Sequence, residues 1–258
     1  MIDTHSHIDG EEFANDRDLA IERARKAGVE KIFVPAISID AIDSVIDTCR
    51  RYPGYAYPMI GLHPEEVKAD WEEQLQRMHQ MLREPNHPFI AVGEVGIDYY
   101  WSREFEKEQV EAFERQVVWA GEYDLPLMIH CRKAQNEVEH VIAQHEQELK
   151  RGGVFHCFTG NIQEAERYLR FDNFVLGIGG VLTFKKSKLP EMLCDIPIER
   201  IVLETDSPYM APVPMRGNRN ESAYVEYVLE KVAEVYGMPK EEVDRVTTAT
   251  AKRIFRLE

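Results

Sequence analysis

The 258-residue sequence has no long apolar run, only four cysteines and fewer basic than acidic residues. Because no stretch of 18 apolar residues occurs, we expect no membrane-spanning helix. The first residues lack the basic and apolar segments of a secretory signal, so we expect no export. The cysteines lie far apart and form no C-x-x-C pair, which favours reduced thiols in a cytoplasmic protein.

Positive charge is scarce, since 31 Lys and Arg residues stand against 46 Asp and Glu residues, for a net charge of −15. A surface this acidic repels polyanions and excludes a broad basic face for nucleic acid. Any nucleic acid substrate must therefore be held by a local site whose cations offset the overall charge. No segment of the sequence indicates an obligatory protein partner.

Short apolar runs alternate with longer amphipathic stretches along the whole chain. We expect eight strands, at residues 2–7, 31–35, 57–62, 89–95, 127–130, 154–158, 174–178 and 201–204. Helical periodicity between them is clearest at 103–123, and two further helices are expected at 221–236 and 240–254. Eight strands alternating with helices predict an α/β TIM-type (β/α)8 barrel, as a single domain over residues 1–258 with an extra C-terminal helix.

Several histidines fall at or near the ends of the expected strands, where a barrel of this type gathers its functional residues. His5 and His7 end the first strand, His130 ends the fifth, and His156 lies in the sixth. Because strand side chains alternate, His5 and His7 point to the same side. A lone histidine at a strand end is more often a hydrogen-bonded core group than a metal ligand. Four at one mouth are costly to bury without a metal or carboxylates.

Carboxylates end two of the other strands. Glu94 ends the fourth, and Glu204 and Asp206 follow the eighth. Each could be a salt-bridged structural acid, but the same mouth offers four histidines and no arginine for each acid. Mixed histidine and carboxylate ligands suit Zn²⁺, Mn²⁺ and Mg²⁺. The four histidines together with Glu94 and Asp206 make six possible ligands, which is more than one tetrahedral ion requires. We therefore predict two divalent ions bridged by Glu94.

Eight sequence blocks occur in one order from end to end: DTHSHID, GLHP, VGEVGIDYY, IHCR, HCFTG, GGVLTFKKSK, LETDSPY and RGNRNES. In this order they resemble the TatD-like metal-dependent deoxyribonucleases of the amidohydrolase superfamily. One departure is Ser222, where that family often has a proline after the glutamate. The position precedes an expected helix, so the departure concerns the start of that helix rather than catalysis.

The resemblance implies which residues bind the metals and what they do. It assigns one ion to His5, His7, Glu94 and Asp206, and the other to Glu94, His130 and His156. It implies nuclease activity, commonly trimming single-stranded DNA or RNA from an end. Glu94 and Asp206 are then the catalytic residues, with Asp206 both a ligand and the base that takes a proton from water. We expect Glu204 to orient a ligand histidine or the residues around Asp206, the alternative being a plain structural acid.

A phosphodiester also needs cationic groups at the mouth, and the candidates for substrate binding are His63, Arg132 and Arg216. The guanidinium fork of Arg132 suits phosphate, although pairing with a structural acid is the alternative. The aromatic residues at 99–101 either stack bases or pack as a lid, and lid packing is the commoner role of such clusters.

Two other functions remain open from the sequence. A metal-activated water also attacks carbonyl groups, so the alternative is an ester or amide hydrolase, such as an aminoacyl-tRNA deacylase or a small-molecule amidohydrolase. A non-enzymatic metal-binding protein is disfavoured because both Glu94 and Asp206 are present.

Overall fold

The computed structural model describes residues 1–257. Within them the strands are β1 (Ile2–Asp3), β2 (Lys31–Pro35), β3 (Ala56–Met59), β4 (Val92–Asp98), β5 (Leu127–Arg132), β6 (Gly153–Phe155), β7 (Phe174–Ile178) and β8 (Ile201–Leu203). The helices are α1 (Arg17–Lys26), α2 (Ile42–Arg51), α3 (Trp71–Leu82), α4 (Glu106–Glu122), α5 (Gln135–Gln144), α6 (Ile162–Leu169), α7 (Leu189–Leu193), α8 (Val225–Tyr236) and α9 (Lys240–Phe255). Over this part of the chain, no helix has the length and apolarity that crossing a membrane requires.

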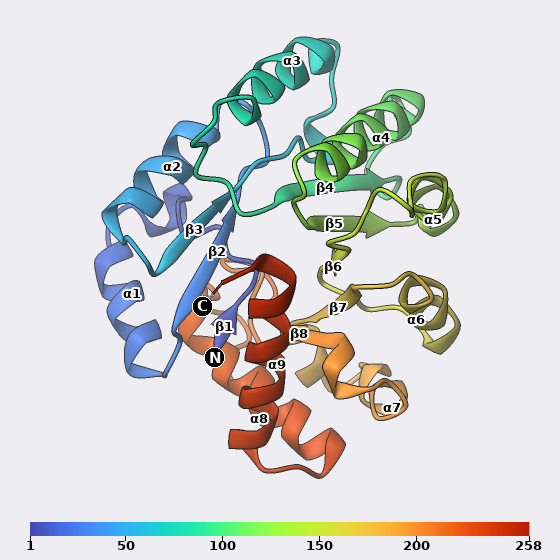
Figure 1. Cartoon of the computed structure of the whole chain (residues 1–258). Coiled ribbons are helices and arrows are strands. Elements are labelled where there is room, and N and C mark those ends of the chain that lie inside the picture. The colour runs from blue at the N-terminus through green and yellow to red at the C-terminus, as the bar shows by residue number, and fades with distance from the viewer. Residues whose placement is uncertain (258) are drawn as a thin grey trace.

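The strands form two parallel sheets, ordered β1-β2-β3 and β4-β5-β6-β7-β8. At one seam Ser6 pairs with Ser207, and at the other Ile60 pairs with Val92. The Gly93 amide also donates to the Ile60 carbonyl at 2.8 Å across the second seam. Figure 1 shows helices α1 to α7 surrounding these strands. This is the α/β TIM-type arrangement that the sequence predicts.

A layer of buried apolar side chains fills the barrel interior. Each strand contributes one, from within or immediately beside it: Ile2, Phe33, Met59, Ala91, Met128, Val154, Val175 and Val202. Because strand side chains alternate, His130 and His156 lie two positions beyond Met128 and Val154 and point to the same interior. The apolar layer therefore lies directly beneath the polar site.

Helix α9 closes the barrel beneath this layer. Ala251, Ile254 and Phe255 pack against the layer, and the rings of Phe255 and Phe33 lie 4.6 Å apart. The extra C-terminal helix expected from the sequence is present, and it plugs the barrel (Figure 1). Only the opposite end, where the strands finish, is left for a site.

Several expected strands differ from the observed ones at their ends. β1 stops at Asp3 rather than at residue 7, although Ser6 still pairs across the seam. β4 runs three residues later than expected, with an irregular register between Val92 and Val95. β6 ends at Phe155, so His156 follows the strand rather than lying within it. The pairing that ends a strand depends on its neighbours, which no single strand sequence specifies.

Removing the aromatic ring that closes the barrel tests this packing. We expect Phe255→Ala to lower the free energy of unfolding by about 3–5 kcal/mol, because it empties a buried site against Phe33. Denaturant titration with a metal chelator present measures the effect on the fold alone. The control Val118→Ala alters an exposed side chain on α4 and should shift stability by less than about 0.5 kcal/mol. Equal midpoints for the two variants would contradict the plug.

Candidate metal centre

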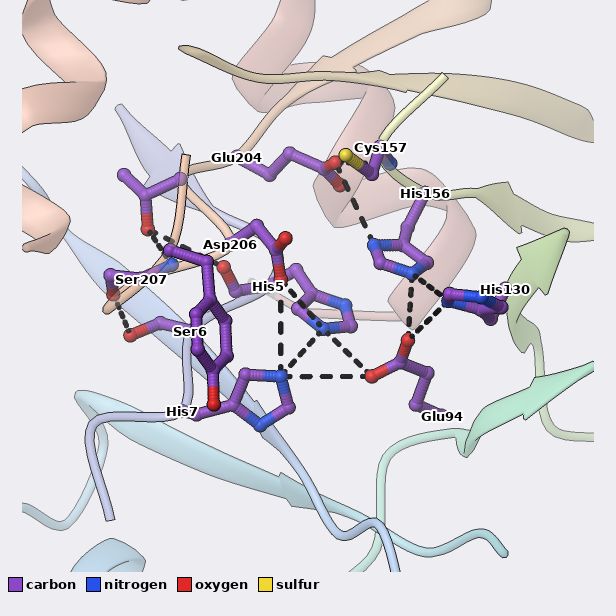
Figure 2. A network of polar contacts seen from close by, with 12 residues as sticks. His5, Ser6, His7, Glu94, His130, His156, Cys157, Glu204, Asp206 and Ser207 are labelled. Carbon is purple, nitrogen blue, oxygen red and sulfur yellow. Dashed lines mark hydrogen bonds and ion pairs between the residues drawn. The ribbon is translucent and has the colours of Figure 1, made fainter. Parts of the chain in front are cut away.

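Figure 2 shows the six predicted metal ligands gathered around one carboxylate. They come from segments far apart in the sequence: Glu94 and His130 lie within β4 and β5, and the other four follow β1, β6 and β8. Ligand atoms close enough to share an ion form three overlapping groups: His5, His7 and Asp206; His5, Glu94 and His156; His63, Glu94 and His130. The structure thus brings all six together, and adds His63 to them.

The Glu94 oxygen Oε2 faces His5 and His7, the two histidines that follow β1. It lies 3.2 Å from His5 Nε2 and 3.6 Å from His7 Nε2. The Asp206 carboxylate closes this side, with Oδ1 3.7 Å from His5 Nε2 and 3.9 Å from His7 Nε2. The two histidine nitrogens are themselves 3.3 Å apart. Four ligand groups therefore converge on one small volume.

The second oxygen of Glu94, Oε1, faces a separate set of nitrogens. It lies 2.8 Å from His156 Nε2, 3.0 Å from His130 Nδ1 and 3.2 Å from His63 Nε2. His130 Nδ1 and His156 Nε2 are 3.4 Å apart. Each oxygen of one carboxylate thus faces its own set of histidine nitrogens.

Burial and neighbouring charges set the protonation of this cluster. Burial lowers the pKa of His5 to about 3 and that of His7 to about 4, so both imidazoles are neutral, the form that binds metals. Burial acts to raise the pKa of Glu94, but the surrounding histidines, His156 first, outweigh it and hold the pKa well below the ordinary value. Burial acts to lower the pKa of His156, but the charge of Glu94 outweighs it and raises that pKa to about 9, so a metal would displace a proton from this ring. Burial raises the pKa of Asp206 to about 7.

These residues fit a divalent metal centre. Neutral imidazoles and carboxylates are the usual ligands of Zn²⁺ and related ions. The raised pKa of Asp206 reflects a buried acid whose neighbours do not offset its desolvation, and a bound cation would favour its ionised form. The donor set and its burial therefore both agree with the predicted metal dependence.

Asp98 is a contributor that the sequence analysis did not include. Its Oδ2 lies 2.8 Å from His130 Nε2, so the ring donates there and turns Nδ1 toward Glu94. A carboxylate that fixes the tautomer of a metal-binding histidine is a recurrent feature of metal sites. The expected strand ended at residue 95, whereas β4 continues to Asp98, four positions beyond Glu94, and alternation then places both side chains on one face.

Glu204 stands behind His156. Its Oε1 accepts a hydrogen bond from the Cys157 amide and lies 3.9 Å from His156 Nδ1. A side chain at position 177 would collide with it, because a Cβ built on Gly177 falls 2.3 Å from Glu204 Oε2. Burial raises the pKa of Glu204 to about 8. The residue thus lies beside His156 without a hydrogen bond to its ring, and outside the three groups of converging ligand atoms.

A second carboxylate missing from the sequence analysis joins β1 to the end of β8. Asp3 is fully buried and accepts hydrogen bonds from the Thr205 amide at 2.9 Å and the Thr205 hydroxyl at 2.7 Å. These bonds hold the chain beside Asp206, whose φ of +56° turns it out of the strand direction. Nothing in the local sequence around Asp3 indicates a partner two hundred residues away.

The three predicted substrate-binding residues lie at different depths. His63 is closest to the centre, with Nδ1 accepting from the Glu65 amide at 3.1 Å and Nε2 directed at Glu94. Arg132 is exposed and forms no ion pair among residues 1–257, although its charge is one of the influences that lower the pKa of Asp98. The Arg216 guanidinium lies 4.0 Å from the centre of the Phe184 ring.

Known proteins share this fold and this sequence pattern. A family model described as TatD related DNase matches residues 2–256. The chain belongs to that family. It is 37% identical over 258 residues to the uncharacterized metal-dependent hydrolase YabD of Bacillus subtilis, covering 100% of this chain and 99% of that protein.

Two further relatives agree. The TatD protein of Erwinia tasmaniensis, named a 3′-5′ ssDNA/RNA exonuclease, is 30% identical over 264 residues, and the match covers 100% of both chains. The crystal structure of the TatD homologue YjjV from Escherichia coli K12 aligns with a TM-score of 0.93 at 29% identity, covering 100% of this chain and 98% of that one. The resemblance, the barrel fold and the expectation of a metal-dependent hydrolase are confirmed.

Asp98 offers a test of the centre that needs no substrate. We expect Asp98→Asn to weaken the binding of Mn²⁺ or Zn²⁺ by about 10–100-fold, because His130 loses its charged partner. Competition with a chromogenic chelator measures the affinity. The matched control Asp47→Asn removes an exposed carboxylate on α2 and should leave it unchanged. An Asp98→Asn protein that binds metal as tightly as the parent would show that His130 needs no such support.

Proposed function

We propose that this protein is a two-metal nuclease that hydrolyses phosphodiester bonds of single-stranded DNA or RNA. The proposal is carried by the contacts of the Glu94 carboxylate. Its Oε2 faces His5 and His7, while its Oε1 faces His130 and His156. The chain also belongs to a family described as TatD related DNase, and this membership supports nucleic acid as the substrate.

In this proposal the first ion is held by His5, His7, Glu94 and Asp206, and the second by Glu94, His130 and His156. Two ions of Mg²⁺, Mn²⁺ or Zn²⁺ would supply a water of lowered pKa and positive charge toward the phosphate oxygens. Glu94 holds the two ligand sets at a fixed spacing. Asp98 orients His130 of the second set through a hydrogen bond, and Glu204 adds a carboxylate 3.9 Å from His156 Nδ1.

Asp206 is the group that takes the proton of the attacking water. Its carboxylate borders the first ligand set and comes from the loop after β8, which leaves it the more accessible of the two central acids. Glu94 is only 3% exposed and is surrounded by imidazoles on both oxygens, so it is less able to exchange a proton. Asp206 therefore serves as base and Glu94 as bridge.

Two arginines and one histidine at the mouth are the groups that would bind the phosphate on this acidic protein. The His63 ring lies beside Glu94, and Arg132 and Arg216 are available at the rim. The guanidinium of Arg132 presents a fork of donors that matches two phosphate oxygens. The two arginines would concentrate positive charge where the phosphate binds, while the net charge of −15 keeps the remaining surface unattractive to polyanions.

The cellular setting and the unit of function follow the same proposal. The four cysteines form no disulfide with one another, which supports a reducing, cytoplasmic location. The family match extends over residues 2–256, which supports the whole chain acting as one catalytic domain.

Removing the base tests the reaction. We expect Asp206→Asn to slow cleavage of an end-labelled single-stranded oligonucleotide with Mg²⁺ or Mn²⁺ by at least about 100-fold, because the water loses its proton acceptor. Gel electrophoresis of the labelled products measures the rate, and Asp47→Asn is the matched control. An Asp206→Asn protein that cleaves as fast as the parent would remove Asp206 from this role.

The same assay separates nuclease from acyl hydrolase. The parent protein should shorten the oligonucleotide only when metal is added, and should leave the acyl group of an aminoacyl-tRNA in place. Metal-dependent release of the acyl group without shortening of the oligonucleotide would replace the nuclease proposal by the ester-hydrolase alternative.

A further inference from the structure

The loop after β4 presents two aromatic rings to solvent at the mouth of the barrel. Tyr100 is 51% exposed and Trp101 65% exposed, and their rings meet edge to face with centres 4.8 Å apart. Tyr99 differs, because it packs against the core and its hydroxyl donates to the Glu106 carbonyl at 3.4 Å. Only Tyr99 behaves as a packing residue, so the loop is not a closed lid.

A guanidinium extends this surface. The Arg132 guanidinium carbon lies 3.6 Å from the centre of the Tyr100 ring and 5.3 Å from that of Trp101. An arginine held flat on a ring keeps its outer face and its edge donors free, and both can contact a nucleotide. We call Tyr100, Trp101 and Arg132 together the aromatic ledge.

The ledge is attached directly to the metal centre. Asp98 accepts from the Tyr100 amide through Oδ1 at 2.7 Å and faces His130 Nε2 through Oδ2 at 2.8 Å. The Tyr99 amide donates to the Arg132 carbonyl at 2.9 Å, and Arg132 follows His130 by two residues in β5. One carboxylate thus positions both a metal ligand and the backbone of the ledge.

We propose that the aromatic ledge stacks a nucleobase of the strand whose phosphate lies at the Glu94 cluster. The proposal rests on the nuclease function above and adds the recognition of bases to it. Aromatic rings and guanidinium planes stack on any base, without regard to sequence. Bases inside a duplex have their faces covered by their neighbours, so the ledge selects single strands.

Stacking also suits the charge of this protein. A net charge of −15 denies the substrate the broad electrostatic attraction on which most nucleic-acid-binding proteins rely. Contact between a base and an aromatic ring does not depend on that attraction. The ledge therefore supplies binding energy that the acidic surface does not, at a distance from the bond that is cleaved.

An oligonucleotide and an abasic strand of the same length and phosphate number separate bases from backbone. For the double variant Tyr100→Ala/Trp101→Ala we expect KM for the oligonucleotide to rise about tenfold or more, with kcat within about twofold of the parent. KM for the abasic strand should stay at the parent value, because that strand has no base to stack. Tyr100→Phe/Trp101→Phe keeps two rings and should restore the KM for the oligonucleotide.

The control Val118→Ala removes a side chain that is 45% exposed on α4, outside the mouth, and should change neither KM. Bound metal measured by elemental analysis should be equal in all variants. An unchanged KM for the oligonucleotide in the double variant, or an equal rise for both strands, overturns the ledge while the nuclease proposal stands. A parent protein that cleaves neither strand with any of the three metals overturns the nuclease proposal itself.

Discussion

The carboxylate of Glu94 is the interaction on which the site depends. It is 3% exposed, and a charge buried to this degree is costly unless partners surround it. Nitrogens of five histidines lie within hydrogen-bonding or ion-pairing distance of its two oxygens. Those histidines have little reason to share one interior without that charge, and bound cations would relieve the repulsion among the acids. The arrangement of side chains at the mouth and the binding of metal therefore both depend on the buried charge of Glu94.

The barrel holds the metal-binding side chains in place, through the apolar layer below them and through hydrogen-bonding acids behind them. The apolar layer and the α9 plug fix the strands on which His130 and His156 stand. Behind the ligands, Asp98 orients His130, and Asp3 holds the chain beside Asp206. Apart from Arg132 at the end of β5, the groups expected to meet substrate lie on loops beyond these supports, so they can vary without disturbing the metal ligands.

The six side chains predicted as ligands converge in the structure because the signal for their positions is local. Each lies in or just beyond a strand, and period-two alternation explains why His5 and His7 face the same volume. The supporting acids were harder to foresee: Asp98 shares a face with Glu94 and was overlooked, while Asp3 binds Thr205, which only folding brings near. Strand ends were shifted for the same reason, since pairing depends on partners. The TatD resemblance added the order of the blocks, which the family match then confirmed.

In the proposed centre, the two oxygens of Glu94 bind two separate ions. Anomalous diffraction from crystals of the protein grown with Mn²⁺ tests it most directly. We expect two peaks, one beside Oε2 among His5, His7 and Asp206, the other beside Oε1 near His130 and His156. A single peak at saturating Mn²⁺, or peaks that contact neither oxygen of Glu94, would contradict it.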